Sequence, residues 1–219
     1  MNITQNWNTC SLSELSDFIT PIEAVAAKHP KIALVVSHRR NSQGAIGTSG
    51  ISEFNYNIKL CKELMRAHTN AVGLGKEEYV DLRMFYRDDI AGCKDGVKRM
   101  HTGIEAWGAD YILNLEFTGS TNRDNEGHSV LYCFKQDEPM AKMLDRQFKK
   151  NLKQAHLGIS KPTTLREFYT LTASSVPTII SRPFFASSQK HYAVEGLDRP
   201  RLVESYLNLF QGLHRLHQA

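Results

Sequence analysis

A histidine and a glutamate frame the first segment of this sequence that could do chemistry. His38 ends an apolar run, and Glu53 opens the next segment, after a loop that contains Gly44, Gly47 and Gly50. Glycines let a chain curl back on itself, so the loop could bring the two side chains together. Imidazole and carboxylate groups are ligands for zinc. The same two residues also fit a hydrogen-bonded histidine and a glutamate that complements a helix dipole.

The elements that would position these residues follow from hydrophobic periodicity. An apolar run over 31–38 predicts a buried strand, and a helical pattern with Ser52 as its N-cap predicts a helix directly after the loop. Residues 11–28 predict a capped helix interrupted near Pro21. The other predicted elements are strands over 79–87, 111–119, 128–134 and 176–185, and helices over 93–108, 138–156 and 200–217. We expect residues 157–175 to be largely irregular.

Alternation of strands and helices predicts an α/β fold with a mostly parallel or mixed sheet. We expect residues 1–30 to form an N-terminal helical extension and residues 31–219 to form one domain. Ligands of such sheets gather beyond the carboxyl ends of the strands. His38, the segment 116–120 and the segment 182–185 all fall at predicted strand ends.

Composition sets broad limits on function. The net charge of +4 and the pI near 8.8 are mildly basic, and aromatic residues do not interleave with basic ones, so we expect no nucleic-acid partner. Four cysteines without CxxC spacing favour reduced thiols, and the N-terminal residues do not resemble a signal peptide, so the expected location is the cytoplasm. No apolar run is long enough to span a membrane. The sequence carries no signal for the oligomeric state.

Three blocks of the sequence resemble the zinc-dependent N-acetylmuramoyl-L-alanine amidases, particularly their phage and prophage versions. The first block is "SHRRNSQGAIGTSGISEFNYNIKLCKEL" (37–64), with a histidine, a Gly-Ala loop and a Ser-Glu helix start. The second is "ADYILNLEFTGSTNRDNEGHSVLYCF" (109–134), and the third is "VPTIISRPFF" (176–185). The resemblance implies an amidase-type sheet of about five or six strands flanked by helices. It also implies peptidoglycan as the substrate.

The resemblance further implies a zinc site and a catalytic base. His38 and Glu53 match the first two zinc ligands, Glu116 stands at the position of the third ligand, which is histidine in the family, and Arg182 stands at the position of the catalytic glutamate. A zinc ion held by His38, Glu53 and Glu116 would activate water. Arginine cannot act as the base because it stays protonated. An ion pair between Glu116 and Arg182 that fills a vacated metal pocket is the alternative.

A third imidazole, His128, stands at the mouth of the strand over 128–134. It could replace the missing ligand, face the substrate groove as the resemblance implies, or be a solvated loop histidine. Glu126 and Glu195 are acids that could in principle replace the lost base. Two functions therefore compete: a zinc-dependent peptidoglycan amidase, and a catalytically silent amidase-like protein that binds a glycan, a peptide or a protein.

Overall fold

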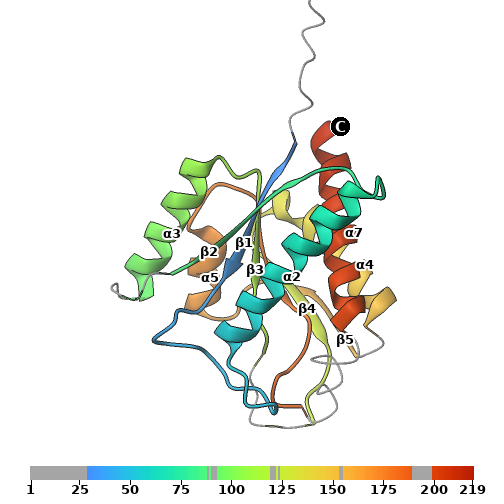
Figure 1. Ribbon diagram of the computed structural model, residues 1–219. Helices are drawn as coiled ribbons and strands as arrows, with labels where there is room; N and C mark the ends of the chain where they lie inside the picture. Colours follow the sequence, from blue (N-terminus) through green and yellow to red (C-terminus); the bar gives the residue numbers. More distant parts are fainter. Residues whose placement is uncertain are drawn as a thin grey trace, which may run out of the picture.

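The computed structural model describes residues 29–87, 89, 93–118, 122, 124–152, 155–188 and 199–219. Its centre is a six-stranded sheet with the strand order β2-β1-β3-β6-β4-β5 (Figure 1). The strands are β1 (Lys31–Val36), β2 (Asp81–Tyr86), β3 (Tyr111–Leu115), β4 (His128–Tyr132), β5 (His156–Ser160) and β6 (Thr178–Arg182). The predicted α/β class with a mixed sheet is confirmed.

The sheet is parallel except where β4 meets β6. β1 pairs in parallel with β2 and β3, and β3 pairs in parallel with β6. β4 runs antiparallel to β6, with Ser129 opposite Arg182, and β5 follows the direction of β4. The start of β4 therefore lies at the same edge of the sheet as the carboxyl ends of β1, β3 and β6. This edge, at the bottom of Figure 1, carries the candidate site.

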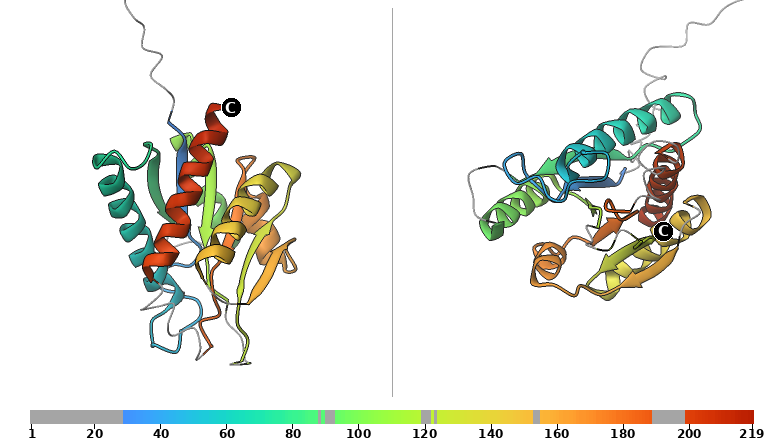
Figure 2. Two further views of the ribbon diagram at one scale, coloured as in Figure 1. Left: turned by 90° about the vertical axis from the view of Figure 1, so that its right-hand side faces the viewer. Right: turned by 90° about the horizontal axis from the view of Figure 1, so that it is seen from below.

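Helices cover both faces of the sheet, as the views in Figures 1 and 2 show. α2 (Glu53–Gly73), α4 (Glu138–Asn151) and α7 (Arg199–Gln218) pack on one face, where one core cluster joins their apolar residues to Leu34, Leu113 and Ile179. α3 (Cys93–Trp107) and α5 (Leu165–Thr172) pack on the other face, against the side chains of alternate strand positions. Strand side chains alternate between faces, which is why core clusters form on both faces of the sheet.

The strands and helices predicted within the described residues are present, with bounds that differ at several ends. Ser52 caps α2 as expected, since its hydroxyl accepts a hydrogen bond from the amide of Asn55. The predicted helix over 11–28 and the predicted extension over 1–30 fall almost wholly outside the described residues. No helix that the structure describes is long and apolar enough to cross a membrane.

The prediction for 157–175 is wrong, and the helix predicted over 138–156 is too long. α4 ends at Asn151, and the following residues form the edge strand β5 and the helix α5. β5 is short and contains Gly158 at a φ of +84°, so its sequence lacks the alternation that marks a strand. α5 does carry a local signal, a capping box in which Thr164 and Glu167 bond each other's backbone amides.

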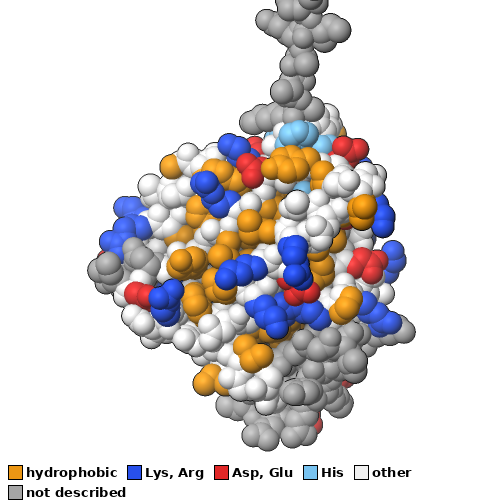
Figure 3. All heavy atoms as spheres, in the orientation of Figure 1, with side chains coloured by type: hydrophobic (Ala, Val, Ile, Leu, Met, Phe, Trp, Pro, Cys, Tyr) orange, Lys and Arg blue, Asp and Glu red, His pale blue; other side chains and the backbone are white. Residues whose placement is uncertain are grey.

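The surface over α2 and α7 carries mixed side chains. Figure 3 shows Lys and Arg side chains in several separate places on this face, with acidic and hydrophobic side chains between them. A modest net charge of +4 distributed in this way creates no extended basic stripe in this view.

Candidate functional site at the carboxyl edge of the sheet

Three strands and one helix bring the predicted site residues together. His38 follows β1, Glu116 follows β3, Arg182 ends β6, and Glu53 is the first residue of α2. Neighbouring parallel strands end at one edge, so these side chains converge there. All four belong to one network of hydrogen bonds and ion pairs. We call these residues, with Arg166 and Glu167 described below, the edge cluster.

His38 and Glu53 are in direct contact. The Nε2 atom of His38 lies 3.0 Å from Oε2 of Glu53, and both side chains are almost fully buried. Oε1 of Glu53 accepts a hydrogen bond of 3.2 Å from the amide of Phe117, which fixes the carboxylate. Nδ1 of His38 is buried without a hydrogen-bond partner among the described residues.

Gly44 permits this contact. It has a φ of +79°, and a β-carbon placed there would lie 2.7 Å from both Glu53 Oε2 and the His38 ring. A side chain at position 44 would therefore be strained in its backbone and would collide with the pair. The glycine-containing loop is built around the two residues, as the sequence predicted.

Two guanidinium groups bind the carboxylate of Glu116. Its Oε2 atom lies 2.9 Å from Nη2 of Arg182, and its Oε1 atom lies 3.1 Å from Nη2 of Arg166. The predicted ion pair between Glu116 and Arg182 is thus confirmed. Burial alone would raise the pKa of Glu116, but the neighbouring Arg166 and Arg182 hold that pKa below its ordinary value. Glu116 is therefore an ionised carboxylate whose two oxygens are both committed to cations.

Arg166 was missed by the sequence prediction. It lies in the first turn of α5, and its Nη2 atom is 3.1 Å from Nε2 of His38 as well as 3.1 Å from Oε1 of Glu116. The guanidinium thus stands between two of the three residues that the resemblance assigned to zinc. The segment that holds Arg166 was predicted to be irregular, and the capping box of α5 was the signal that could have placed it on a helix.

Glu167, the next residue, holds Arg182 from the other side. Nη1 of Arg182 lies 2.7 Å from Oε1 of Glu167, while Oε2 of Glu167 accepts hydrogen bonds from the amides of Thr163 and Thr164. Partial burial would raise the pKa of Glu167, but the Thr163 amide, Arg182 and the Thr164 amide together lower that pKa to about 2. Arg182 therefore bridges two ionised carboxylates.

His128 lies apart from this network. Its side chain is fully buried on the α4 face, and its ring packs 5.5 Å from the ring of Phe148. The interpretation as a solvated loop histidine is wrong, because the ring is buried. The predicted role of His128 in a substrate groove stays a prediction. Glu126 is half-buried before β4, and Glu195 falls outside the described residues.

The protein is an α/β protein with helices on both faces of a mixed six-stranded sheet and a polar cluster at the carboxyl edge. In such sheets, ligands bind beyond the carboxyl ends of the strands. The family model described as N-acetylmuramoyl-L-alanine amidase matches residues 32–194. The chain therefore belongs to this amidase family, and its fold and family are those of the peptidoglycan amidases. No curated protein matches the chain in sequence.

Solved structures agree in fold. The catalytic domain of the amidase CwlV from Bacillus (Paenibacillus) polymyxa var. colistinus superposes with a TM-score of 0.68 at 13% identity, over 84% of this chain and 97% of that one. An N-acetylmuramoyl-L-alanine amidase from Clostridium difficile 630 gives 0.68 at 15% identity, over 87% and 98% of the two chains. AmiC2 of Nostoc punctiforme gives 0.65 at 16% identity, over 87% and 98%. At these identities the structures establish the shared fold.

Members of this family are typically zinc enzymes, so the edge cluster can be tested against a zinc ion. Both oxygens of Glu116 bond guanidinium groups, and His38 Nε2 is engaged by Glu53 Oε2 and Arg166 Nη2. A zinc ion would need the lone pairs that these contacts use, and it would face two permanent cations at close range. This arrangement of side chains does not fit a zinc ion.

Proposed function

We propose that the protein is an amidase-family member that binds peptidoglycan stem peptides without hydrolysing them. The observation that carries the proposal is the position of Arg166, whose Nη2 atom lies 3.1 Å from both His38 Nε2 and Glu116 Oε1. A guanidinium supplies positive charge at that point, as a metal would, but it binds ligands through N–H donors and has no site for activating water.

Hydrolysis also needs a proton acceptor, which the cluster lacks at the expected place. Arg182 occupies the position of the family's catalytic glutamate, and its interactions with Glu116 and Glu167 raise its pKa against the opposing effect of burial. It remains protonated at any working pH and cannot take a proton from water. Glu116 and Glu167 are themselves poor bases, because their pKa values are lowered by the same arginines.

The exposure and the hydrogen-bond donors of Arg166 support the binding of a peptide. The side chain of Arg166 is 46% exposed, and its bonds to described residues use only Nη2. Its remaining N–H groups can donate to carboxylate and carbonyl oxygens, which stem peptides present in number. Glu116 and His38 hold the guanidinium in place, so little rotamer freedom is lost on binding. The proposal therefore assigns Arg166 as the ligand-binding residue and the others as its support.

A zinc-dependent amidase is the second candidate. The observation that favours it is the contact between His38 and Glu53, which keeps the first two ligand positions of the family side by side. For this candidate, zinc would have to displace Arg166 from His38 and Glu116. Direct digestion of cell wall in the presence of zinc separates the two functions.

The test combines sedimentation with insoluble peptidoglycan and analysis of the soluble fraction. We expect the wild type to sediment with the wall at low salt and to release no stem peptide, with or without added zinc. Arg166→Ala should weaken retention at least tenfold, whereas Arg215→Ala, which removes an exposed arginine from the last turn of α7, should leave it unchanged. Zinc-dependent release of stem peptide would support the hydrolase instead. Absence of retention at low salt would exclude the wall as the ligand.

A further inference from the structure

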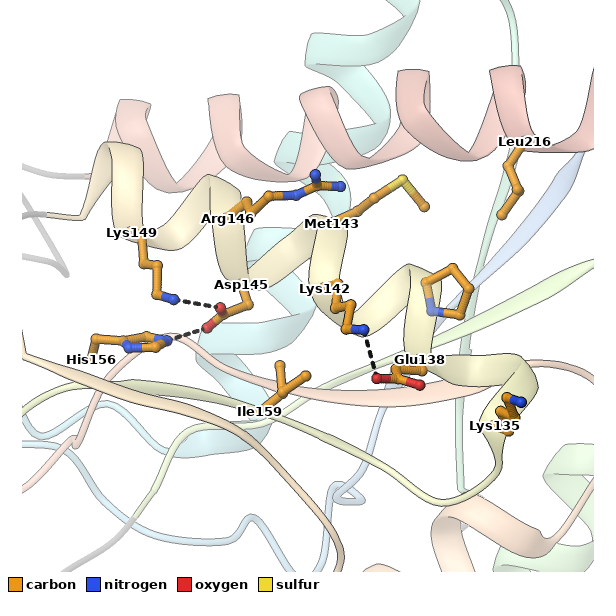
Figure 4. A pocket seen from close by; sticks show the side chains of 11 residues that line it. Lys135, Glu138, Lys142, Met143, Asp145, Arg146, Lys149, His156, Ile159 and Leu216 are labelled. Carbon is orange, nitrogen blue, oxygen red and sulfur yellow. Dashed lines mark hydrogen bonds and ion pairs between the residues drawn. The ribbon is translucent and has the colours of Figure 1, made fainter.

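A second cluster lies at the same edge of the sheet, under α4 and outside the edge cluster. β4 and β5 both begin with a histidine, and His128 and His156 are paired in the parallel register of the two strands. α4 covers them and contributes Asp145. Figure 4 shows Asp145 and His156 pointing toward each other at the wall of a groove, with Lys149 beside them. We call His128, Asp145 and His156 the strand-start cluster.

The backbone brings the two histidines close. The amide of His128 donates a 3.0 Å hydrogen bond to the carbonyl of Ala155, directly before His156. Gly127 precedes His128 at a φ of +123°, and a β-carbon there would lie 2.7 Å from the same carbonyl oxygen. Glycine at position 127 therefore allows the starts of β4 and β5 to approach as they do.

The three side chains present one ligand atom each at metal-binding separations. His156 Nε2 lies 2.7 Å from Asp145 Oδ1, His128 Nε2 lies 3.8 Å from the same oxygen, and the ligand atoms all lie within 4.8 Å of one another. Ligand atoms of a tetrahedral zinc ion are about 3.4 Å apart, given bonds of about 2.1 Å. The observed separations lie on both sides of that value, so small rotations of the side chains would bring the three ligand atoms to the spacing that a zinc ion requires.

His128 supplies an independent reason to expect a ligand. Its side chain is fully buried, yet neither ring nitrogen has a hydrogen-bond partner among the described residues. The 3.8 Å separation from Asp145 is too long for a hydrogen bond. A buried imidazole without partners is costly, and an ion between Nε2 and Oδ1 would give Nε2 a partner.

The carboxylate of Asp145 supplies negative charge beside the two imidazoles. Lys149 Nζ lies 3.2 Å from Oδ2 of Asp145, which leaves Oδ1 directed at the histidines. The His156 side chain is 35% exposed and lines an open groove of about 720 Å³, through which an ion can enter.

We propose that His128, Asp145 and His156 form a binding site for a divalent transition-metal ion of the zinc type. Two imidazoles and one carboxylate are ligands that zinc accepts, and they leave one coordination position open toward the groove. The site goes beyond the proposed peptide binding, because it uses other residues, which belong to β4, β5 and α4. The test of this metal site is therefore independent of the test of peptide binding at the edge cluster.

Zinc titration of tag-free full-length protein tests the site, with calorimetry and competition against a chelator as readouts. We expect one zinc ion per chain. Asp145→Asn and His156→Ala should each weaken binding at least about tenfold, because each removes a ligand from a three-ligand set. His156 is partly exposed, so its replacement spares the core, whereas replacement of the buried His128 risks misfolding.

Two control variants test whether histidines outside the strand-start cluster account for the zinc binding. His214→Ala removes a histidine of the pair 214 and 217 on the last helix, and His38→Ala removes the histidine of the edge cluster; both should keep one zinc per chain. The proposal is overturned if the wild type takes up no zinc, since the cluster is then only a hydrogen-bonded His–Asp pair. It is also overturned if zinc binding survives Asp145→Asn and His156→Ala, or is lost with His214→Ala or His38→Ala.

Discussion

The edge cluster and the strand-start cluster contain similar residue types, but their side chains have different hydrogen-bond and ion-pair partners. Each contains imidazole and carboxylate groups at the same edge of the sheet; α2 and α5 contribute to the first cluster, and α4 contributes to the second. In the edge cluster, Arg166 and Arg182 bond both oxygens of Glu116. In the strand-start cluster, His128 has no hydrogen-bond partner among the described residues.

This difference shows that ligand-type residues alone do not define a metal site. Whether such residues can bind a metal depends on whether their lone pairs already accept hydrogen bonds from fixed cations. Arginine uses them permanently, because a guanidinium keeps its charge and its planar donors at any working pH. The residues that the family resemblance assigned to zinc are therefore engaged in hydrogen bonds and ion pairs, whereas both ring nitrogens of His128 lack a hydrogen-bond partner among the described residues.

The largest expected effect comes from removing the guanidinium groups and restoring the family's residues. The triple variant Glu116→His, Arg182→Glu, Arg166→Ala should gain zinc-dependent amidase activity, at least about a hundredfold above the wild-type background, because a positioned general base contributes roughly that much or more. Release of stem peptide from purified cell wall measures the gain.

The double variant Glu116→His, Arg182→Glu is the matched control for the triple variant. These two changes restore the family's residues at the third-ligand and base positions, but the structure places Arg166 against His38 as well. The double variant should therefore remain near background, and adding His38→Ala to the triple variant should abolish its activity. Equal activity of the double and triple variants would show that Arg166 does not block the site.

The two arginines should differ in their effect on stability. Arg182 is 19% exposed and bridges two buried carboxylates, so Arg182→Ala should lower the free energy of unfolding by about 3–5 kcal/mol. Arg166 is 46% exposed, so Arg166→Ala should lower it by only about 1 kcal/mol. Urea denaturation at neutral pH measures both. Similar losses would contradict the view that Arg182 supports the cluster while Arg166 faces its ligand.

Gly44 and Gly50 test how closely the loop packs on the His38–Glu53 pair. Both have a φ near +80°, but only a β-carbon at position 44 meets other atoms. Gly50→Ala should cost roughly 1 kcal/mol through backbone strain. Gly44→Ala should cost about 1–3 kcal/mol more through collision with the pair. If thermal or urea denaturation gives the same loss for both, the loop does not hold the pair in place.

The smallest expected effect concerns pH. The pKa of Glu167 in the folded protein is about 2, below its ordinary value of 4.5, so its contribution to stability is complete above about pH 4.5 and is lost as the pH falls toward 2. Glu167→Gln keeps a hydrogen-bond acceptor but removes the charge. The stability gap between wild type and variant should be about 1 kcal/mol at pH 6 and should close on acidification. Urea midpoints at several pH values measure it, and a gap that stays constant would contradict the lowered pKa.

Most of the fold followed from the sequence because its central elements have strong periodicity. β1 is a continuous buried apolar run, and α2 combines an N-cap with a helical repeat. β5 and α5 were missed because a five-residue edge strand with a glycine at positive φ shows no alternation, and a short helix gives few periods to detect.

The sequence also located four members of the edge cluster and anticipated one of its ion pairs. It did not identify Arg166, because that residue reaches the cluster from α5, far along the chain from His38, and its segment was read as irregular. The strand-start cluster depends on the register of β4 with β5 and on the packing of α4, both of which are tertiary. The sequence indicates His128 as a candidate but gives no sign of Asp145 and His156 as its neighbours.

Anomalous scattering at the zinc edge, from crystals grown with zinc, tests the central contrast between the clusters most directly. The account predicts an anomalous peak among His128, Asp145 and His156, and none among His38, Glu53 and Glu116. A peak between His38 and Glu116, with Arg166 turned away, would contradict it and would restore the zinc amidase as the leading function.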